Sequence, residues 1–110
     1  MSPLVLGEFE QLVLLGILRK GSNAFSLRVR EEIERQGRKK VSRGAFYTTL
    51  DRMEEKGLVI WRPSEPENPL RKGTQRLFSV TPKGIDAIRF TRNTLEARRA
   101  RLDEALERLG

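Results

Sequence analysis

The hydrophobic periodicity of this 110-residue chain changes at Gly57. Before this glycine, apolar residues recur at steps of three and four, which is the spacing of one helix face. After it, LVIW at 58–61 and the alternating QRLFSV at 75–80 are typical of short β-strands. The segment PSEPENPLRKGT between them contains three prolines and a Lys-Gly turn, so we expect a β-wing with a long, basic loop.

Three helical segments precede the wing. Residues 7–19 are apolar almost all round, so this helix has more than one face to bury. Gly16 in its interior lowers helix propensity and therefore indicates close packing at that point. We expect a second helix over 24–36 and a third over 42–57, with Ser42 as the N-cap of the third. Helix, helix, helix and wing is the layout of a winged helix-turn-helix.

The third helix has two faces with different chemistry. Its buried face would carry an apolar stripe formed by Ala45, Phe46, Thr49, Leu50 and Met53. The exposed face of its first two turns carries polar residues suited to base edges and phosphates, namely Ser42, Arg43, Tyr47 and Thr48. The fork of Arg43 matches two acceptors on the major-groove edge of guanine. Gly44 has no side chain, which would let the backbone approach DNA or a neighbouring helix.

Basic residues flank this helix and the wing loop. Lys39 and Lys40 precede the helix, while Arg71, Lys72 and Arg76 fall in the wing. We expect all five to contact phosphate, which gives affinity and register without sequence information. A solvated basic loop is the alternative for any one of them. The net charge of +7 favours a polyanionic partner, although many proteins are cationic for solubility alone.

The last helical segment, 82–109, is too long to hide one apolar stripe on so small a domain. Thr81 and Pro82 supply its N-cap and first position. One line of residues spaced by seven is apolar throughout: Ile88, Leu95, Leu102 and Leu109. A companion line is apolar only at its ends: Ile85, Arg92, Arg99 and Leu106. We expect this helix to form a homodimer together with Phe9 and Leu12 of the first helix; the alternative is a helix lying on its own domain.

Several absences argue against catalysis. The chain has no histidine or cysteine, and neither G-x-x-x-x-G-K-[ST] nor G-x-G-x-x-G occurs. The adjacent carboxylates Glu31–Glu32 and Glu54–Glu55 lie in helical runs rich in Arg and Lys. We expect them to be solvated helix surface rather than an acid–base pair. The prediction is therefore a protein that is not an enzyme and uses no metal or cofactor.

The cellular location is also predicted from features that the sequence lacks. No apolar run reaches the length of about eighteen residues needed for a membrane span, and no signal peptide opens the chain. The lack of cysteine fits a reducing compartment. We expect a cytoplasmic protein without a membrane partner.

Trp61 is the only tryptophan in the chain and lies on the first predicted strand. A tryptophan on a short strand is expected to pack in the core or on the sheet. The alternative is that it borders a pocket for an aromatic effector.

Three segments resemble the PadR family of bacterial transcriptional regulators: LGEFEQLVLLGIL at 6–18, VSRGAFYTTLDRMEEKGLV at 41–59 and FSVTPKGIDAI at 78–88. The middle segment carries the pattern Y-x-x-L-x-R-[LM]-E-x-x-G-L-[IV], and the resemblance covers nearly the whole chain. It implies a homodimer of winged helix-turn-helix subunits, usually a repressor of nearby promoters. It also implies that Tyr47, Thr48 and their neighbours read DNA and that the single C-terminal helix, as in the short subfamily, is the dimerisation element.

The chain departs from some relatives at the last helix. Short members that bind drugs carry a tryptophan there, which stacks planar ligands at the dimer centre. Here Phe90 is the only aromatic residue of that helix, and the arginines of the seam disfavour apolar cations. The resemblance therefore does not carry over the class of any small-molecule effector.

These patterns predict a mainly α fold with a small β-wing. Residues 1–81 would form the DNA-binding domain and 82–110 the dimerisation helix. The predicted function is a homodimeric repressor that binds a palindromic operator in double-stranded DNA, with release by a small-molecule effector left open. The alternatives are an architectural protein that binds DNA by charge alone, and a winged-helix module that binds another protein.

Overall fold

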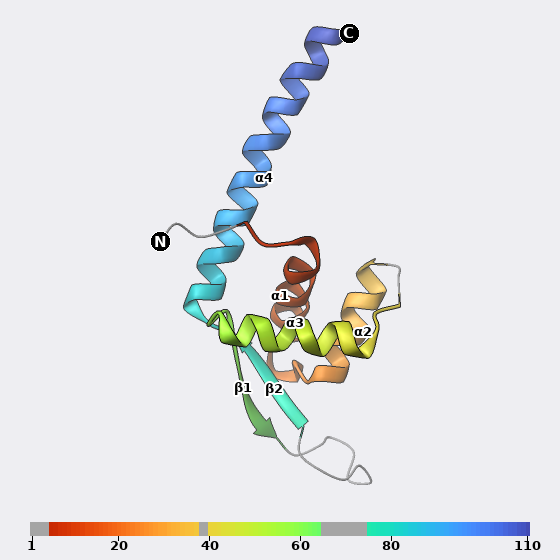
Figure 1. Ribbon diagram of the computed structural model, residues 1–110, viewed down its shortest axis with the longest axis vertical. Coiled ribbons are helices and arrows are strands. Elements are labelled where there is room, and N and C mark those ends of the chain that lie inside the picture. Colours follow the sequence, from red (N-terminus) through yellow and green to blue (C-terminus); the bar gives the residue numbers. More distant parts are fainter. Residues whose placement is uncertain (1–4, 38–39, 65–74) are drawn as a thin grey trace.

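The computed structural model describes residues 5–37, 40–64 and 75–110. It contains α1 (Glu8–Lys20), the short 3-10 turn η1 (Gly21–Asn23), α2 (Ser26–Gly37), α3 (Arg43–Glu55), β1 (Val59–Ser64), β2 (Gln75–Val80) and α4 (Pro82–Leu109). This order confirms the predicted winged helix-turn-helix with a long last helix (Figure 1). Three predicted phosphate contacts, Lys39, Arg71 and Lys72, lie outside the described residues.

The helix ends follow the signals in the sequence. The Ser42 hydroxyl oxygen accepts a hydrogen bond from the Ala45 backbone N–H at 3.1 Å, so Ser42 is the N-cap of α3. Thr81 caps α4 in the same way, and Pro82 occupies its first position. Gly57 closes α3 with a φ of 75°, and the Leu58 N–H donates to the Met53 carbonyl at 2.9 Å. This is a Schellman motif, in which the left-handed conformation favours glycine.

The two strands form an antiparallel sheet in which Val59 pairs with Val80 and Ser64 with Gln75. A single bridge between Phe25 and Leu77 attaches β2 to the start of α2. The core lies between the sheet and the first three helices. Its fully buried large side chains include Leu14, Ile17, Phe46, Leu50, Met53 and Phe78. The predicted α3 stripe is confirmed at Phe46, Leu50 and Met53, whereas Ala45 is exposed and Thr49 is half-buried.

Gly16 confirms the predicted close contact between α1 and α2. A Cβ added at Gly16 would lie 3.3 Å from Cγ1 of Val29 and 3.4 Å from Cγ1 of Ile33. Both distances are shorter than an ordinary carbon–carbon contact of about 3.5–4.0 Å. The absence of a side chain at this glycine therefore sets how closely the two helices approach.

Glu32 corrects one expectation, because its side chain is buried and not part of the solvated surface. It accepts hydrogen bonds from Gln36 Nε2 at 2.9 Å, from Arg19 Nε at 2.9 Å and from Arg35. Lys20 Nζ lies 3.6 Å from its second oxygen. The hydrogen bond from Gln36, opposed by desolvation and supported by Arg35 and Lys20, lowers the pKa of Glu32 to about 2. The carboxylate thus joins α1 to α2 as an anion.

α4 divides into a part that packs on its own domain and a part that does not. Gly84, Ala87 and Thr91 are buried, and the Thr91 hydroxyl accepts the Leu6 N–H at 3.0 Å. From Leu95 to Gly110 every residue is exposed. Figure 1 shows this second half leading away from the other helices, opposite the end of the molecule where the strands lie. The described molecule is therefore long, with a largest extent of 61 Å.

Candidate nucleic-acid interface

α3 presents a continuous exposed stripe on the side opposite the core. Arg43, Gly44 and Thr48 are all exposed. No atom outside the helix's own backbone would contact a Cβ added at Gly44, so the space beside it is open. Because the cap uses the Ala45 N–H, the preceding N–H groups of the first turn are left without helical partners, as at any helix start. This end of α3 can accept a phosphate, and its side chains can reach base edges.

Tyr47 is only partly exposed. Its ring lies edge-on to Phe46, with centroids 5.3 Å apart and planes at 67°. It also packs against the core cluster. The ring is therefore held in place by the protein, which leaves the phenolic end as the part that could meet DNA.

Arg52 was not predicted from the sequence but extends the stripe. It is exposed and lies one turn after Thr48, which itself lies one turn after Gly44. The spacing of four along the helix could have identified it. Lys40, before α3, is exposed as predicted. The described part of this surface thus carries cations at both ends of α3.

The predicted phosphate contact Arg76 has partners within the protein. Its guanidinium carbon lies 4.7 Å from the centre of the Trp61 ring. Its Nη1 lies 3.7 Å from Oδ1 of Asp51 on α3. Trp61 is 37% exposed and its Nε1–H donates to Glu54 Oε2 at 3.0 Å, so it packs on the sheet surface and not in the core. The contact of Arg76 with phosphate stays a prediction.

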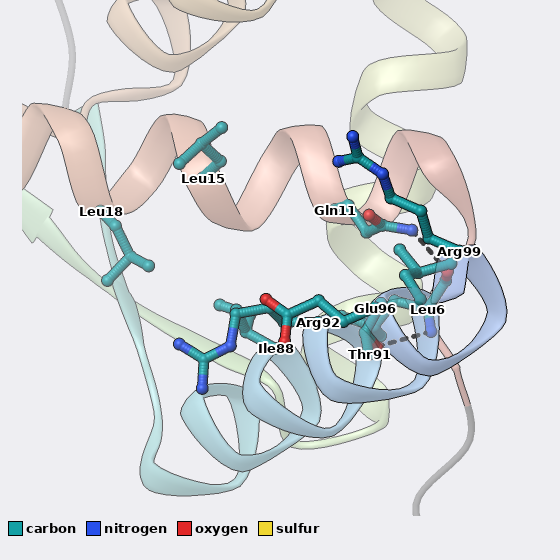
Figure 2. Close-up of a pocket in the computed structure, with 10 residues that line it drawn as sticks. Leu6, Gln11, Leu15, Leu18, Ile88, Thr91, Arg92, Glu96 and Arg99 are labelled. Atoms are coloured by element: carbon teal, nitrogen blue, oxygen red, sulfur yellow. Dashed lines mark hydrogen bonds between the residues drawn. The ribbon is translucent and has the colours of Figure 1, made fainter. Parts of the chain in front are cut away.

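A second surface feature is an apolar groove of about 380 Å³ between α1 and α4 (Figure 2). Leu15, Leu18 and Leu95 line it with Leu6 and Ile88. Polar side chains line it as well: Gln11, Thr91, Arg92, Glu96 and Arg99. Leu15 and Leu18 are 41% and 46% exposed, although they belong to an otherwise well-packed helix. The groove therefore leaves apolar side chains of both helices in contact with solvent.

The residues predicted for dimerisation fall into two groups. Phe9, Leu12 and Ile88 are half-buried and pack against the core of their own subunit, and Ile85 is half-buried as well. Leu95, Leu102, Leu106 and Leu109 are exposed by 40%, 63%, 63% and 85%. On α1, the apolar side chains that face outward are Leu15 and Leu18, which the sequence reasoning did not select. A helix that is apolar all round gives no signal for which face its own core will use.

The three helices, the cap of α3 and the wing together match a known family. The model of the transcriptional regulator PadR-like family matches residues 14–89, which is more than half of the chain. The chain belongs to the PadR-like family. It is accordingly a DNA-binding transcriptional regulator and not an enzyme. No curated protein matched the chain.

Solved structures show the same PadR-like fold. A PadR family regulator from hypervirulent Clostridium difficile R20291 superposes with a TM-score of 0.67 at 18% identity, covering 89% of this chain and 98% of that one. A PadR-like transcription factor from Bacteroides fragilis gives 0.64 at 20%, covering 93% and 89%. RosR from H. salinarum gives 0.65 at 24%, covering 96% and 94%. In the described parts of the chain, none of the helices combines the length and apolar character needed to cross a membrane.

Proposed function

We propose that this PadR-like protein is a homodimeric repressor that binds a two-fold symmetric operator. In this proposal α3 reads bases through Arg43, Tyr47 and Thr48, and the wing binds phosphate. Residues 1–81 form the DNA-binding domain and 82–110 the dimerisation helix, although the first turns of that helix also complete the core. Repression is part of the proposal because the resemblance to the family usually implies a repressor of nearby promoters. The half-sites would lie about one helical turn, ~34 Å, apart.

The observation that carries the proposal is the apolar stripe of α4, which continues past the domain without a cover. At 100° per residue, Leu95, Leu102 and Leu106 lie on the same side of the helix as the buried Gly84 and Thr91. The first half of this stripe is covered by the protein's own helices, whereas the second half meets solvent. A second copy of α4 would cover it and, beside it, Leu15 and Leu18. In a symmetric dimer the two identical subunits contribute the same surface, so each copy covers the exposed stripe of the other.

The groove between α1 and α4 also indicates what kind of effector the dimer could accept. Arg92 and Arg99 line it beside the leucines, with Glu96 between them (Figure 2). If two such grooves met at the two-fold axis of the dimer, the shared site would contain the arginines of both subunits. Such a site favours an anionic or neutral molecule over an apolar cation.

Sedimentation velocity of a charge-substituted α4 tests the dimer. Leu95→Arg combined with Leu102→Arg should convert the protein to monomer, because two charges would enter the seam. The matched control is Asn93→Arg with Ala100→Arg, which adds the same charges at the same spacing on the opposite face of α4. The control should remain dimeric. A dimer that persists in the leucine variant, or that is lost equally in both variants, would contradict the proposed seam.

A further inference from the structure

Four side chains connect the wing to the second half of α3. Asp51 and Glu54 come from α3, Trp61 from β1 and Arg76 from β2. The indole N–H of Trp61 donates to Glu54 Oε2 at 3.0 Å. The guanidinium of Arg76 covers the Trp61 ring at 4.7 Å and approaches Oδ1 of Asp51 at 3.7 Å. Each strand therefore makes a polar contact with α3, and the Trp61 and Arg76 side chains that make these contacts stack on each other.

The register of the sheet explains why these side chains meet. Trp61 pairs with Phe78, and directly paired residues of an antiparallel sheet project from the same face. Phe78 and Val59 are buried on this face, which is the one that meets α3, whereas Leu77 is buried on the other face. Asp51 and Glu54 are three residues apart and lie on one side of α3. The neighbouring Ile60 projects from the other face and is 58% exposed.

Among the described residues, the outer part of each strand has few buried side chains. Past Trp61, none of the described residues of β1 is buried, and Gln75 and Arg76 of β2 are not buried either. A two-stranded hairpin on its own is marginally stable in water. The inner part is fixed by the buried Val59, Leu77 and Phe78, which lie at or before the middle of the described strand pairing. Further out, the contacts of Trp61 and Arg76 join the described ends of both strands to α3.

We propose that Asp51, Glu54, Trp61 and Arg76 form a latch that fixes the wing against α3. The latch holds the base-reading helix and the phosphate-binding wing at one relative angle, so that both meet the duplex in a single register. Its members are positioning residues, and Glu54 and Trp61 need not touch DNA themselves. The inference rests on the proposed roles of α3 and the wing in DNA binding.

Substitutions of Glu54 separate the latch from simple charge effects. Glu54→Gln and Glu54→Ala both remove one negative charge, so both change the general attraction of DNA equally. Only glutamine keeps an acceptor for the Trp61 N–H. Loss of one such hydrogen bond corresponds to about a three- to tenfold change in an equilibrium constant. We therefore expect Glu54→Ala to bind duplex DNA about three- to tenfold more weakly than Glu54→Gln.

Two further readouts distinguish positioning from a general loss of structure. The slope of log K against log salt concentration should be shallower for Glu54→Ala than for Glu54→Gln. The difference should be about one for each phosphate contact of the wing that is lost. In a Trp61→Phe background, which has no indole N–H, the two Glu54 variants should bind equally. Ile60→Ala is the matched control, since it truncates an exposed side chain on the other face of the same strand. It should leave the salt slope unchanged.

The sole tryptophan also reports the latch without DNA. Acrylamide should quench Trp61 fluorescence more strongly in Glu54→Ala than in Glu54→Gln.

In the binding experiments, the DNA probe is the duplex that the unmodified protein selects from a random pool. Equal quenching, or equal affinity and salt slope in the two variants, would overturn the latch. Failure of the unmodified protein to select any duplex would instead refute the proposed DNA recognition. Because quenching is measured without DNA, it would still test the latch in that case.

Discussion

Gly84→Ala is the substitution that most sharply tests how α4 is attached to the domain. An added Cβ would lie 2.2 Å from the Leu58 carbonyl oxygen and 2.7 Å from Cγ1 of Val80. The Leu58 oxygen cannot retreat freely, because it accepts the Thr81 N–H at 3.0 Å. An ordinary carbon–oxygen contact is about 3.3 Å or more, so the backbone must separate by about 1 Å. The start of α4 would be pushed away from the loop before β1.

The expected cost combines overpacking with helix propensity. Overpacking a tight site costs about 1–3 kcal/mol and occasionally more, and this contact is with backbone that cannot rotate away. Alanine in place of glycine returns less than about 1 kcal/mol, since Gly84 lies in the first turn of the helix. We expect a net loss of about 2 kcal/mol in the free energy of unfolding. For a chain of this size the melting temperature would fall by about 8 °C.

Urea unfolding measures this loss, and a single protein concentration for all variants keeps the contribution of dimer dissociation comparable between them. Gly44→Ala is the control, because Gly44 also lies in the first turn of a helix but has open space beside it. It should be neutral or stabilising by a few tenths of a kcal/mol. If Gly84→Ala proved as stable as Gly44→Ala, the close approach of α4 to Leu58 would be refuted.

Three other substitutions test separate parts of the structure. The pKa of Glu32 is lowered from 4.5 to about 2, so its stabilising effect is complete above pH 4.5 and is lost as the pH falls toward 2. Glu32→Gln should therefore destabilise the protein at neutral pH and flatten the stability profile in that window, as measured by urea unfolding at several pH values. Arg43→Ala should cost about 1–3 kcal/mol on the preferred site and relax specificity at one base, and equal weakening on all sequences would contradict base reading. Arg52→Ala should weaken binding to all duplexes alike and reduce the salt slope by about one, whereas a change of consensus would give it a reading role.

The elements with local signals could be predicted from the sequence. Ser42, Thr81 and Gly57 carry the chemistry that starts or ends a helix, and that chemistry depends on a few neighbouring residues. The pattern in 75–80 likewise predicted β2, although the structure buries the adjacent Leu77 and Phe78 on opposite faces of the sheet. The length and spacing of α4 showed that its stripe exceeded its own domain.

Features set by tertiary contacts could not be predicted. The sequence around Glu32 is typical of a surface carboxylate, and only the packing of α1 on α2 places Arg19 and Lys20 beside it. Trp61 and Arg76 are fifteen positions apart, and only the sheet register stacks one on the other. Leu12 packs against the core of its own subunit whereas Leu15 is 41% exposed, and that choice depends on which side of α1 faces its neighbours. Each of these depends on an angle between elements, which periodicity does not encode.

The central claim is that this PadR-like regulator recognises a specific sequence as a symmetric dimer. Selection of bound duplexes from a random library, carried out at two salt concentrations, tests it most directly. We predict a two-fold symmetric consensus, with half-sites about one helical turn apart, that survives the higher salt. Binding that collapses with salt and leaves no consensus would mean that charge alone drives association, and no binding at either salt would favour a protein partner; either result would contradict the account.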